Sequence, residues 1–247
     1  MNTKDDFSDL KAVYINCSIK KDKTGSHTQN LLNKSAKIMQ SQGVEVQHIY
    51  ALDYAIAFGM MQDGNTEGQK DDWPDIQKQI MQADILVIGT PIWLGVKSSV
   101  ATQVIERLYA FSGEYNDAGQ YAYYGKVGGC VITGNEDGIK HCSMDLLYAM
   151  QHIGFTIPPQ ADCGWIGEAG PGPSYGDVEF NGKKVNPDGT PAGYDNEFTD
   201  KNTTFAAWNL MHMAALLKAQ GGIPALGNTK DGWKQVVNAQ SENPEYR

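Results

Sequence analysis

The sequence contains few cysteines and no pattern that groups them. Its four cysteines are Cys17, Cys130, Cys142 and Cys163, and no two of them form a C-x-x-C pair. Iron–sulfur clusters need grouped thiolates, and cysteine-based zinc sites and disulfide frameworks are marked by characteristic cysteine spacings that this sequence lacks. We therefore expect neither a metal centre nor a disulfide framework, and we predict that Cys17, Cys130 and Cys163 act as small buried side chains.

Long apolar runs and an excess of basic residues are also missing. No apolar run approaches the roughly 18 residues that a membrane-spanning helix needs. The first six residues are polar, unlike a signal peptide. With 20 Lys and Arg against 29 Asp and Glu, the net charge of −9 disfavours nucleic acid or an anionic membrane as a partner. The sequence predicts a cytoplasmic protein that binds neither.

Two common nucleotide-binding motifs are absent, and one hydrolase motif occurs in an unsuitable place. No G-x-G-x-x-G follows a strand-like run, and no G-x-x-x-x-G-K-[S/T] is present. Residues Gly172 to Gly176 match G-x-S-x-G, but the nucleophile elbow of α/β-hydrolases needs a strand before it and a helix after it. Gly and Pro precede this motif, and an Asn/Gly/Pro-rich stretch follows it. A serine hydrolase using Ser174 is thus a remote alternative.

Strand-like and helix-like segments alternate along the 247 residues, which predicts a parallel sheet with helices on its faces. Short apolar runs indicate five strands, at residues 11–17, 44–49, 85–89, 126–133 and 163–166. Apolar positions at helical spacing indicate helices at residues 28–42, 73–82, 98–111, 136–153 and 203–220.

Two long irregular segments interrupt this alternation. Residues 53–75 and 168–202 are rich in polar residues, and the second is also rich in Gly and Pro. Loops longer than about 12–15 residues are usually functional or disordered, so we interpret both segments as insertions. Within the second, Asn181-Gly182 is a favoured turn pair and predicts a small hairpin over residues 178–185.

The loop from Gly89 to Gly95 is the most informative stretch of the sequence. It follows the apolar run 83–88 and precedes a helix-like segment, so it lies where a buried strand ends. Ligands of doubly wound sheets sit beyond the carboxyl ends of the strands. Pro91 and Gly95 shape the backbone, while Trp93 offers a broad apolar face. This combination predicts a site for a flat ligand.

A second polar loop follows the first strand and opens the first helix. Hydroxyl groups at Ser18, Ser26 and Thr28, together with the unpaired N–H groups of the helix start, are suited to binding an anion. Lys20 could add positive charge. Ordinary capping of the helix by Ser26 or Thr28 explains the same residues without a ligand.

A third loop of this kind, Thr133 to Gly138, follows the fourth strand. Gly134 and Gly138 allow a close approach of the backbone, and Asn135 and Glu136 offer polar contacts. Here too, a plain helix cap is the alternative interpretation. The three loops converge on one edge of one sheet, and that convergence favours a shared ligand site.

Together these loops resemble the FMN-binding loops of flavodoxin-like NAD(P)H-dependent FMN and quinone reductases, over about residues 11–166. Residues 164–177, 221–224 and 243–247 resemble a bacterial "flavodoxin family protein" branch. The resemblance implies an α/β, flavodoxin-like three-layer fold with a five-stranded parallel sheet of order 2-1-3-4-5 and loop insertions, and we expect one FMN-binding domain over residues 1–247. It implies that FMN binds to Ser18, Lys20, Ser26, Thr28, Pro91, Ile92, Trp93, Leu94, Gly95, Thr133, Gly134, Asn135 and Gly138.

The implied activity is electron transfer from NADPH or NADH through FMN to a quinone, a flavin or a similar small acceptor, by a homodimer or homotetramer. Because flavin carries the redox chemistry itself, no catalytic side chain is required. We interpret the histidines as structural or surface residues, namely His27, His141, His152 and His212. Aromatic pairs that could form a platform for the acceptor are Tyr123 with Tyr124 and Trp165 with Tyr175.

Two further alternatives remain open at this point. A flavodoxin-type carrier would hold FMN without turning over NAD(P)H, and a binding protein could retain the fold without flavin. The long C-terminal part of the chain favours the reductase over the shorter carrier.

Overall fold

The computed structural model describes residues 7–20, 22–61, 66–170 and 172–237. Its sheet runs in the order β2-β1-β3-β5-β6, and every neighbouring pair in this path is parallel. This is the predicted order, since these strands are the five that the sequence indicated. The flavodoxin-like α/β fold is therefore confirmed. The strands are β1 (Lys11–Asn16), β2 (Glu45–Tyr50), β3 (Ile85–Trp93), β5 (Val127–Asn135) and β6 (Asp162–Gly167).

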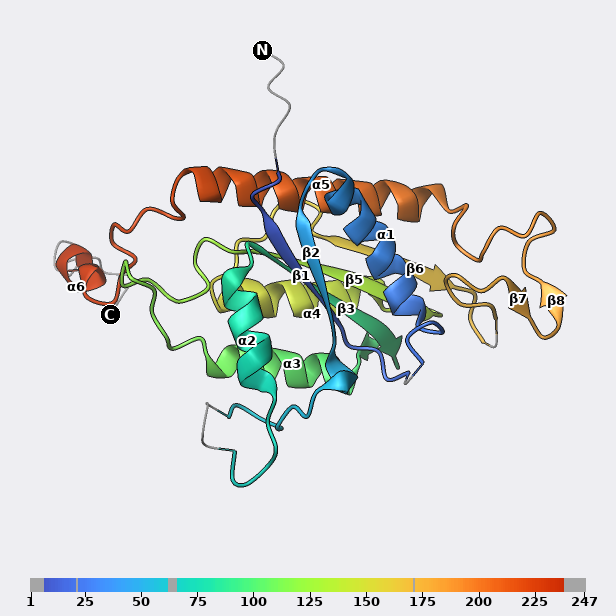
Figure 1. Cartoon of the computed structure of the whole chain (residues 1–247), viewed down its shortest axis with the longest axis horizontal. Helices are drawn as coiled ribbons and strands as arrows, with labels where there is room; N and C mark the ends of the chain where they lie inside the picture. Colours follow the sequence, from blue (N-terminus) through green and yellow to red (C-terminus); the bar gives the residue numbers. More distant parts are fainter. Residues whose placement is uncertain (1–6, 21, 62–65, 171, 238–247) are drawn as a thin grey trace, which may run out of the picture.

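Helices cover both faces of the sheet and make three layers (Figure 1). One face carries α1 (His27–Ser41) and α5 (Glu197–Ala219). The other carries α2 (Trp73–Gln82), α3 (Ser99–Ala110) and α4 (Ile139–His152). Successive side chains of a strand point to opposite faces, and β1 divides accordingly: Val13 and Ile15 pack on the α2–α4 side, and Ala12 and Tyr14 on the α1/α5 side.

The third strand is longer than predicted, which corrects the interpretation of residues 89–95 as a loop. β3 continues through Trp93, turns at Leu94 and Gly95, and pairs with β4 (Val96–Lys97) as a sixth, antiparallel strand. Both turn residues have positive φ, 50° and 78°. This matches the turn that suits a two-residue hairpin. Residues 85–90 of β3 are buried, the next two are half-buried and Trp93 is exposed, so the apolar run of the sequence marked only the buried part of the strand.

The two insertions differ from prediction mainly at their ends. The η1–α2 segment (residues 54–72) follows a short 3-10 helix, η1 (Ala51–Asp53). The β6–α5 segment (residues 168–196) contains the expected hairpin, β7 (Glu179–Phe180) with β8 (Lys183–Lys184). It ends earlier than predicted because Asn196 caps α5 by accepting a hydrogen bond from the Thr199 amide.

The C-terminal part adds one helix that the sequence did not indicate, α6 (Gly232–Val237). Residues 243–247, which contributed to the resemblance, lie outside the described residues. On α5, Leu210 and Met211 are buried against the sheet, whereas Phe205 and Leu216 are exposed. Most of the apolar stripe of α5 therefore serves the core.

The cysteines are buried and their thiols are free. For Cys17, Cys130 and Cys163 this confirms the predicted role as small core residues. Over the residues that the structure describes, no cluster of three metal-ligating side chains occurs. Over the same residues, no helix has the length and apolar character needed to cross a membrane.

Candidate functional site

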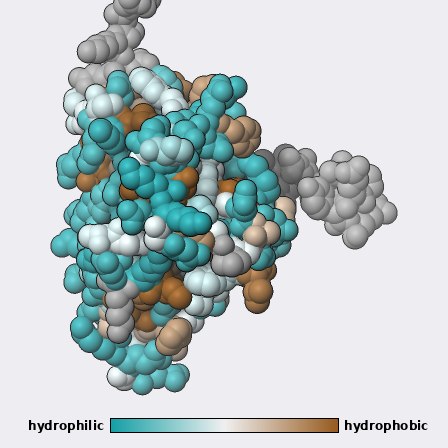
Figure 2. Space-filling model, turned by 90° about the vertical axis from the view of Figure 1, so that its right-hand side faces the viewer, coloured by the Kyte–Doolittle hydropathy of each residue, from teal (hydrophilic) through white to brown (hydrophobic). Residues whose placement is uncertain are grey.

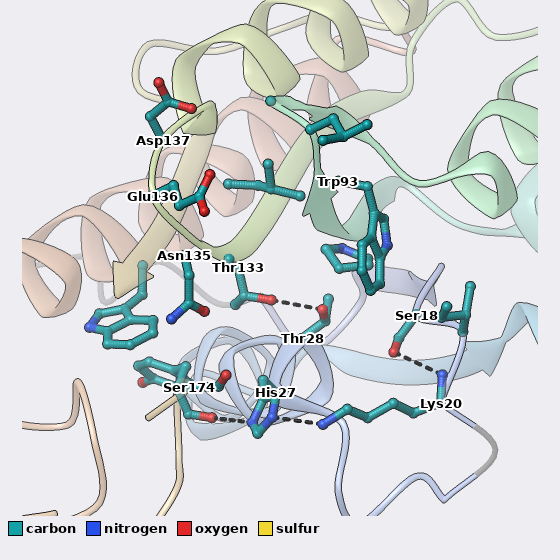
Figure 3. Close-up of a pocket in the computed structure, with 18 residues that line it drawn as sticks. Ser18, Lys20, His27, Thr28, Trp93, Thr133, Asn135, Glu136, Asp137 and Ser174 are labelled. Carbon is teal, nitrogen blue, oxygen red and sulfur yellow. Dashed lines mark hydrogen bonds between the residues drawn. The ribbon is translucent and has the colours of Figure 1, made fainter. Parts of the chain in front are cut away.

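The main pocket lies at the carboxyl ends of β1, β3 and β5, where ligands of such sheets bind. Its volume is about 600 Å³, within the range of roughly 300–1,000 Å³ usual for small-molecule sites. All three predicted loops contribute to it (Figure 3). The predicted residues that line it are Ser18, Lys20, Thr28, Pro91, Ile92, Trp93, Leu94, Gly95, Thr133, Gly134 and Asn135.

Two predicted binding residues, Ser26 and Gly138, lie behind the lining and do not reach the main pocket. Ser26 is fully buried, and its hydroxyl accepts hydrogen bonds from the Gln29 amide at 3.2 Å and from Asn16 Nδ2 at 3.3 Å. It therefore acts as the cap of α1. Gly138 has a φ of 104°, and a Cβ there would lie 2.8 Å from Gly95 Cα. Its role is to let the Thr133–Gly138 loop touch the β3–β4 turn.

The first loop presents positive charge and hydrogen-bond donors. Lys20 Nζ donates to Gly25 O and to His27 Nε2, both at 2.7 Å. The Ser18 hydroxyl accepts a bond from the Lys20 amide at 3.3 Å. His27 and Thr28 are the first two residues of α1, and amides at this place in a helix have no partner within the helix. With the helix dipole they favour an anion.

Two hydroxyl groups form the floor of the main pocket. Thr28 Oγ1 and Thr133 Oγ1 lie 2.8 Å apart, and both residues are buried. This bond joins the start of α1 to β5, and Figure 3 shows it at the centre of the site. It fixes two of the three loops relative to each other.

The β3–β4 turn makes an apolar wall on one side. Trp93 is 51% exposed and Leu94 is fully exposed. Gly134 is needed beneath this wall, since a Cβ there would lie 2.8 Å from Ile92 Cβ. A flat ligand could therefore rest against Trp93 while the close-packed backbone of β5 lies behind it.

The β6–α5 segment and β6 also line the pocket. The β6–α5 segment contributes Ser174 and Tyr175, and β6 contributes Trp165. Ser174 was not indicated as a binding residue by the sequence, although β6 ends at the same sheet edge as β1, β3 and β5. The suggested pair Trp165–Tyr175 does face the pocket, with ring centroids 5.8 Å apart. Glu136, which the sequence offered as a polar contact, lines the pocket as well, and the lining residues that the sequence did not indicate are Ile19, His27 and Asp137.

The alternative aromatic pair, Tyr123 with Tyr124, does not lie at the main pocket. Tyr123 is fully buried, stacks on Phe155 with a centroid distance of 4.7 Å, and donates to Leu108 O at 3.1 Å. Tyr123 is a core residue.

His27, which the sequence analysis interprets as a structural or surface residue, lines the main pocket. Its Nδ1 lies 2.9 Å from Tyr175 O and 3.5 Å from Asp177 Oδ1. Burial lowers the pKa of His27 below its usual value, and Lys20 lowers it further, while Asp177 and the Tyr175 carbonyl oppose the shift. Of the other histidines, His141 and His152 are exposed.

The G-x-S-x-G stretch lacks the geometry of a nucleophile elbow. Within the described residues, neither a strand directly before Gly172 nor a helix directly after Gly176 is present. Although Ser174 lines the pocket, the nearby imidazole of His27 faces Tyr175 O and Lys20 instead. A charge-relay arrangement does not form.

The chain is similar to one known protein family and to several known proteins. Residues 10–165 match the model of a family described as NADPH-dependent FMN reductase. The 8-demethyl-8-aminoriboflavin-5'-phosphate synthase of Streptomyces davaonensis is 32% identical over 216 residues, which cover 85% of this chain and 79% of that protein. The crystal structure of RosB, with a bound 8-demethyl-8-formylriboflavin-5'-phosphate intermediate, has a TM-score of 0.79 and 29% identity, covering 95% of this chain and 88% of RosB.

A third relative is more similar but much longer. A Mycobacterium bovis protein named divalent metal cation transporter MntH is 48% identical over 235 residues, 90% of this chain, and the chain spans 33% of its length. The matched family uses FMN and NADPH, and its model spans β1 to β5 and the beginning of β6. The chain belongs to the NADPH-dependent FMN reductase family.

Proposed function

We propose that this protein is an FMN-dependent oxidoreductase that passes electrons from NADPH or NADH to a quinone, a flavin or a similar small acceptor. One observation carries the proposal. The main pocket combines a cationic, amide-rich end at the start of α1 with an apolar wall at Trp93, and both come from loops matched by the family model.

The residues present fit FMN by their chemistry. Ser18, Lys20 and the first amides of α1 are suited to a phosphate. Trp93, Pro91 and Ile92 are suited to a flat ring system. The close contacts at Gly134 and Gly138 keep side chains out of the space between the β3–β4 turn and β5.

When bound, FMN would supply the hydride and electron transfer between NAD(P)H and the acceptor. The chain would bind and orient the partners. Lys20 would balance the charge of a phosphate, Trp93 covers one side of the pocket, and the Thr28–Thr133 bond keeps the loops in register. Figure 2 shows one end of the molecule, where hydrophobic patches interrupt a largely hydrophilic face.

We also propose that the chain acts as one FMN-binding domain in a cytoplasmic homodimer or homotetramer. Exposed Tyr109, Met144 and Tyr148 on α3 and α4 offer an apolar surface for self-association. Light scattering of the purified protein would give the number of chains per particle.

The purified protein tests the central proposal directly. We expect it to bind FMN and to lose the visible absorption of the flavin when NADPH or NADH is added without oxygen, and a quinone should restore the absorption. A purified protein that does not bind added FMN would contradict the proposal. One that binds FMN but reacts only with a chemical reductant would support the flavodoxin-type carrier instead.

A second candidate function treats the flavin phosphate as substrate. It is supported by the synthase and RosB relatives, because the RosB match covers 95% of this chain and so extends into the β6–α5 segment that lines the pocket. Mass spectrometry of the flavin recovered after incubation with amine donors distinguishes the two. An unchanged FMN mass favours the reductase.

A further inference from the structure

His27 lies in the main pocket between the ammonium group of Lys20 and the β6–α5 segment. It is the first residue of α1, beside the amides and hydroxyls suited to a phosphate. Lys20 Nζ lies 2.7 Å from its Nε2, and Tyr175 O lies 2.9 Å from its Nδ1 (Figure 3). On the Tyr175 side, Asp177 Oδ1 lies 3.5 Å away.

These contacts define the protonation state of the imidazole. A carbonyl oxygen only accepts hydrogen bonds, so Nδ1 carries the proton that bonds to Tyr175 O. A lysine ammonium only donates, so Nε2 must be the acceptor for Lys20. Both contacts are satisfied together by the neutral imidazole alone. In the pocket without ligand, a proton on Nε2 would point at the ammonium of Lys20. Both groups would then be donors, and the hydrogen bond between them would be lost.

A bound phosphate would favour the protonated imidazole instead of the neutral one. A phosphate monoester carries a charge of about −2 at neutral pH and has three acceptor oxygens. Between Lys20 and His27 it would accept from both, so a proton on Nε2 becomes favourable. Asp177 stabilises the resulting imidazolium from the opposite side, and its other oxygen, Oδ2, is held by the Ser174 amide at 2.8 Å. The charged groups facing His27 are Lys20 from the first loop and Asp177 from the β6–α5 segment.

We propose that His27 is a proton-linked phosphate-recognition residue, which is neutral and bonded to Lys20 in the free pocket and takes up a proton when a phosphorylated flavin binds. The inference rests on the proposed function, because it assigns the phosphate end of the FMN site. It gives the β6–α5 segment a role through Tyr175 O and Asp177, and it makes the preference for FMN over riboflavin depend on pH.

The direction of the pH dependence follows from this linkage. The pKa of His27 is lowered in the free protein, chiefly by burial and then by Lys20, and the bound phosphate raises it. Protonated His27 is therefore favoured in the complex, and its contribution to FMN affinity is lost as the pH rises through the pKa of the complex. Riboflavin lacks the phosphate, so its affinity has no such dependence.

Calorimetric titration measures the proton directly. FMN and riboflavin are titrated in two buffers of different ionisation enthalpy, at about pH 7.5, where the phosphate is already almost fully ionised. We expect proton uptake with FMN and none with riboflavin. His27→Gln retains an acceptor for Lys20 and His27→Asn retains a donor to Tyr175 O, and neither titrates. Both should abolish the uptake and weaken FMN roughly tenfold, as for loss of a hydrogen bond to a charged group, with riboflavin affinity little changed.

His48 is the matched control. Burial lowers the pKa of His48 as well, but His48 does not line the main pocket. His48→Gln should retain the uptake. Proton uptake that persists in both His27 variants, or that is equal with riboflavin, would overturn the inference while leaving the FMN site intact. Failure of the unmodified protein to bind FMN would instead overturn the proposed function, and the inference with it.

Discussion

The two insertions of this fold are both long and polar in sequence, but they have different roles in the structure. The β6–α5 segment brings Ser174 and Tyr175 into the main pocket and contacts His27. The described residues of the η1–α2 segment (54–61 and 66–72) contribute nothing to that pocket and pack against α3 instead (Figure 1). Length and polarity identified both segments as insertions but did not distinguish their roles. The difference is the part of the fold that each segment packs against: the β6–α5 segment forms a wall of the main pocket, which we call the ligand wall, and the η1–α2 segment binds to α3, which we call the structural clamp.

The structural clamp centres on a buried ion pair. Arg107 of α3 is fully buried, and its Nη2 donates to Asp71 Oδ2 at 2.7 Å. The other oxygen of Asp71 accepts from the Ala57 amide at 3.0 Å and from the Trp73 amide at 3.3 Å. One carboxylate thus fixes the segment, the start of α2 and the last turn of α3.

The largest expected effect comes from breaking this pair. Asp71→Asn leaves the Arg107 guanidinium buried without a counter-charge, which costs about 3–5 kcal/mol in the free energy of unfolding. Chemical denaturation measures the loss. FMN affinity of the folded protein should stay unchanged, since neither residue lines the main pocket.

Asp72→Asn is the control on the same segment. Asp72 is partly exposed and pairs with the exposed Lys70, and the bond that it accepts from the Ala55 amide at 2.8 Å can be kept by the Asn oxygen, so we expect a loss of about 1 kcal/mol or less. Equal losses for the two variants would contradict the assignment of Asp71 as the clamp. Restoration of stability by Arg107→Met in the Asp71→Asn background would support it, because the uncompensated charge is then removed.

The second effect concerns the opposite wall of the pocket. Trp93→Asp replaces the ring by a carboxylate and should weaken FMN by roughly 10- to 100-fold, as expected from loss of about 1–3 kcal/mol of aromatic stacking. The free energy of unfolding should change little, because Trp93 is half exposed. Fluorescence titration with FMN measures the affinity.

Val96→Asp provides the comparison for Trp93. Val96 pairs with Trp93 in the β3–β4 hairpin and is similarly exposed, but it does not line the main pocket. Its substitution should leave FMN affinity within about twofold of the original, as is usual for surface changes. If both variants weaken FMN equally, the hairpin rather than the Trp93 ring is responsible.

The strand order and most of the candidate site could be predicted because both depend on local signals. Buried parallel strands read as apolar runs, and the loops after them converge on one edge wherever the strands are parallel. The extension of β3 through Trp93 could not be predicted, because burial decreases from Thr90 to the exposed Trp93 and the last two residues, Ile92 and Trp93, pair only with the two residues of β4. That His27 lines the pocket could not be predicted, because its partner Tyr175 lies 148 positions further along the chain and meets it only in the folded protein, as does Asp177.

The third effect tests the ligand wall through one glycine. Gly193 has a φ of 77°, and a Cβ there would lie 2.5 Å from Trp165 Nε1 and 2.7 Å from Tyr175 Cδ2. Gly193→Ala should push apart these two pocket residues, destabilise the protein by about 1–3 kcal/mol and weaken FMN. Denaturation and flavin titration measure the two effects.

Gly189→Ala isolates the backbone contribution. Gly189 has a similar φ of 83°, but nothing lies within 4 Å of its Cβ position. We expect a cost of about 1 kcal/mol from the left-handed conformation and no change in FMN affinity. A loss of FMN affinity in Gly189→Ala as large as in Gly193→Ala would show that the segment responds to backbone strain and not to contact with Trp165 and Tyr175.

The smallest expected effect comes from removing the hydroxyl of Tyr175, which distinguishes the role of its side chain from that of its backbone carbonyl. Its backbone oxygen accepts from His27, whereas its hydroxyl is buried and has no hydrogen-bond partner among the described residues. Tyr175→Phe removes the unpaired hydroxyl and keeps both the carbonyl and the ring contact with Tyr194, 5.2 Å between centroids. We expect the free energy of unfolding to be unchanged or to rise by up to about 1 kcal/mol, with FMN affinity and its proton uptake unaffected.

Tyr14→Phe is the matched substitution in the core. The Tyr14 hydroxyl is equally buried but lies 3.0 Å from Ser35 Oγ, so its removal should cost about 1 kcal/mol. The difference between the two variants measures what a satisfied hydroxyl contributes at similar burial. A Tyr175→Phe protein that loses as much stability as Tyr14→Phe would mean that the Tyr175 hydroxyl is paired, and the β6–α5 segment would then be held by its side chain as well as by the His27–carbonyl contact.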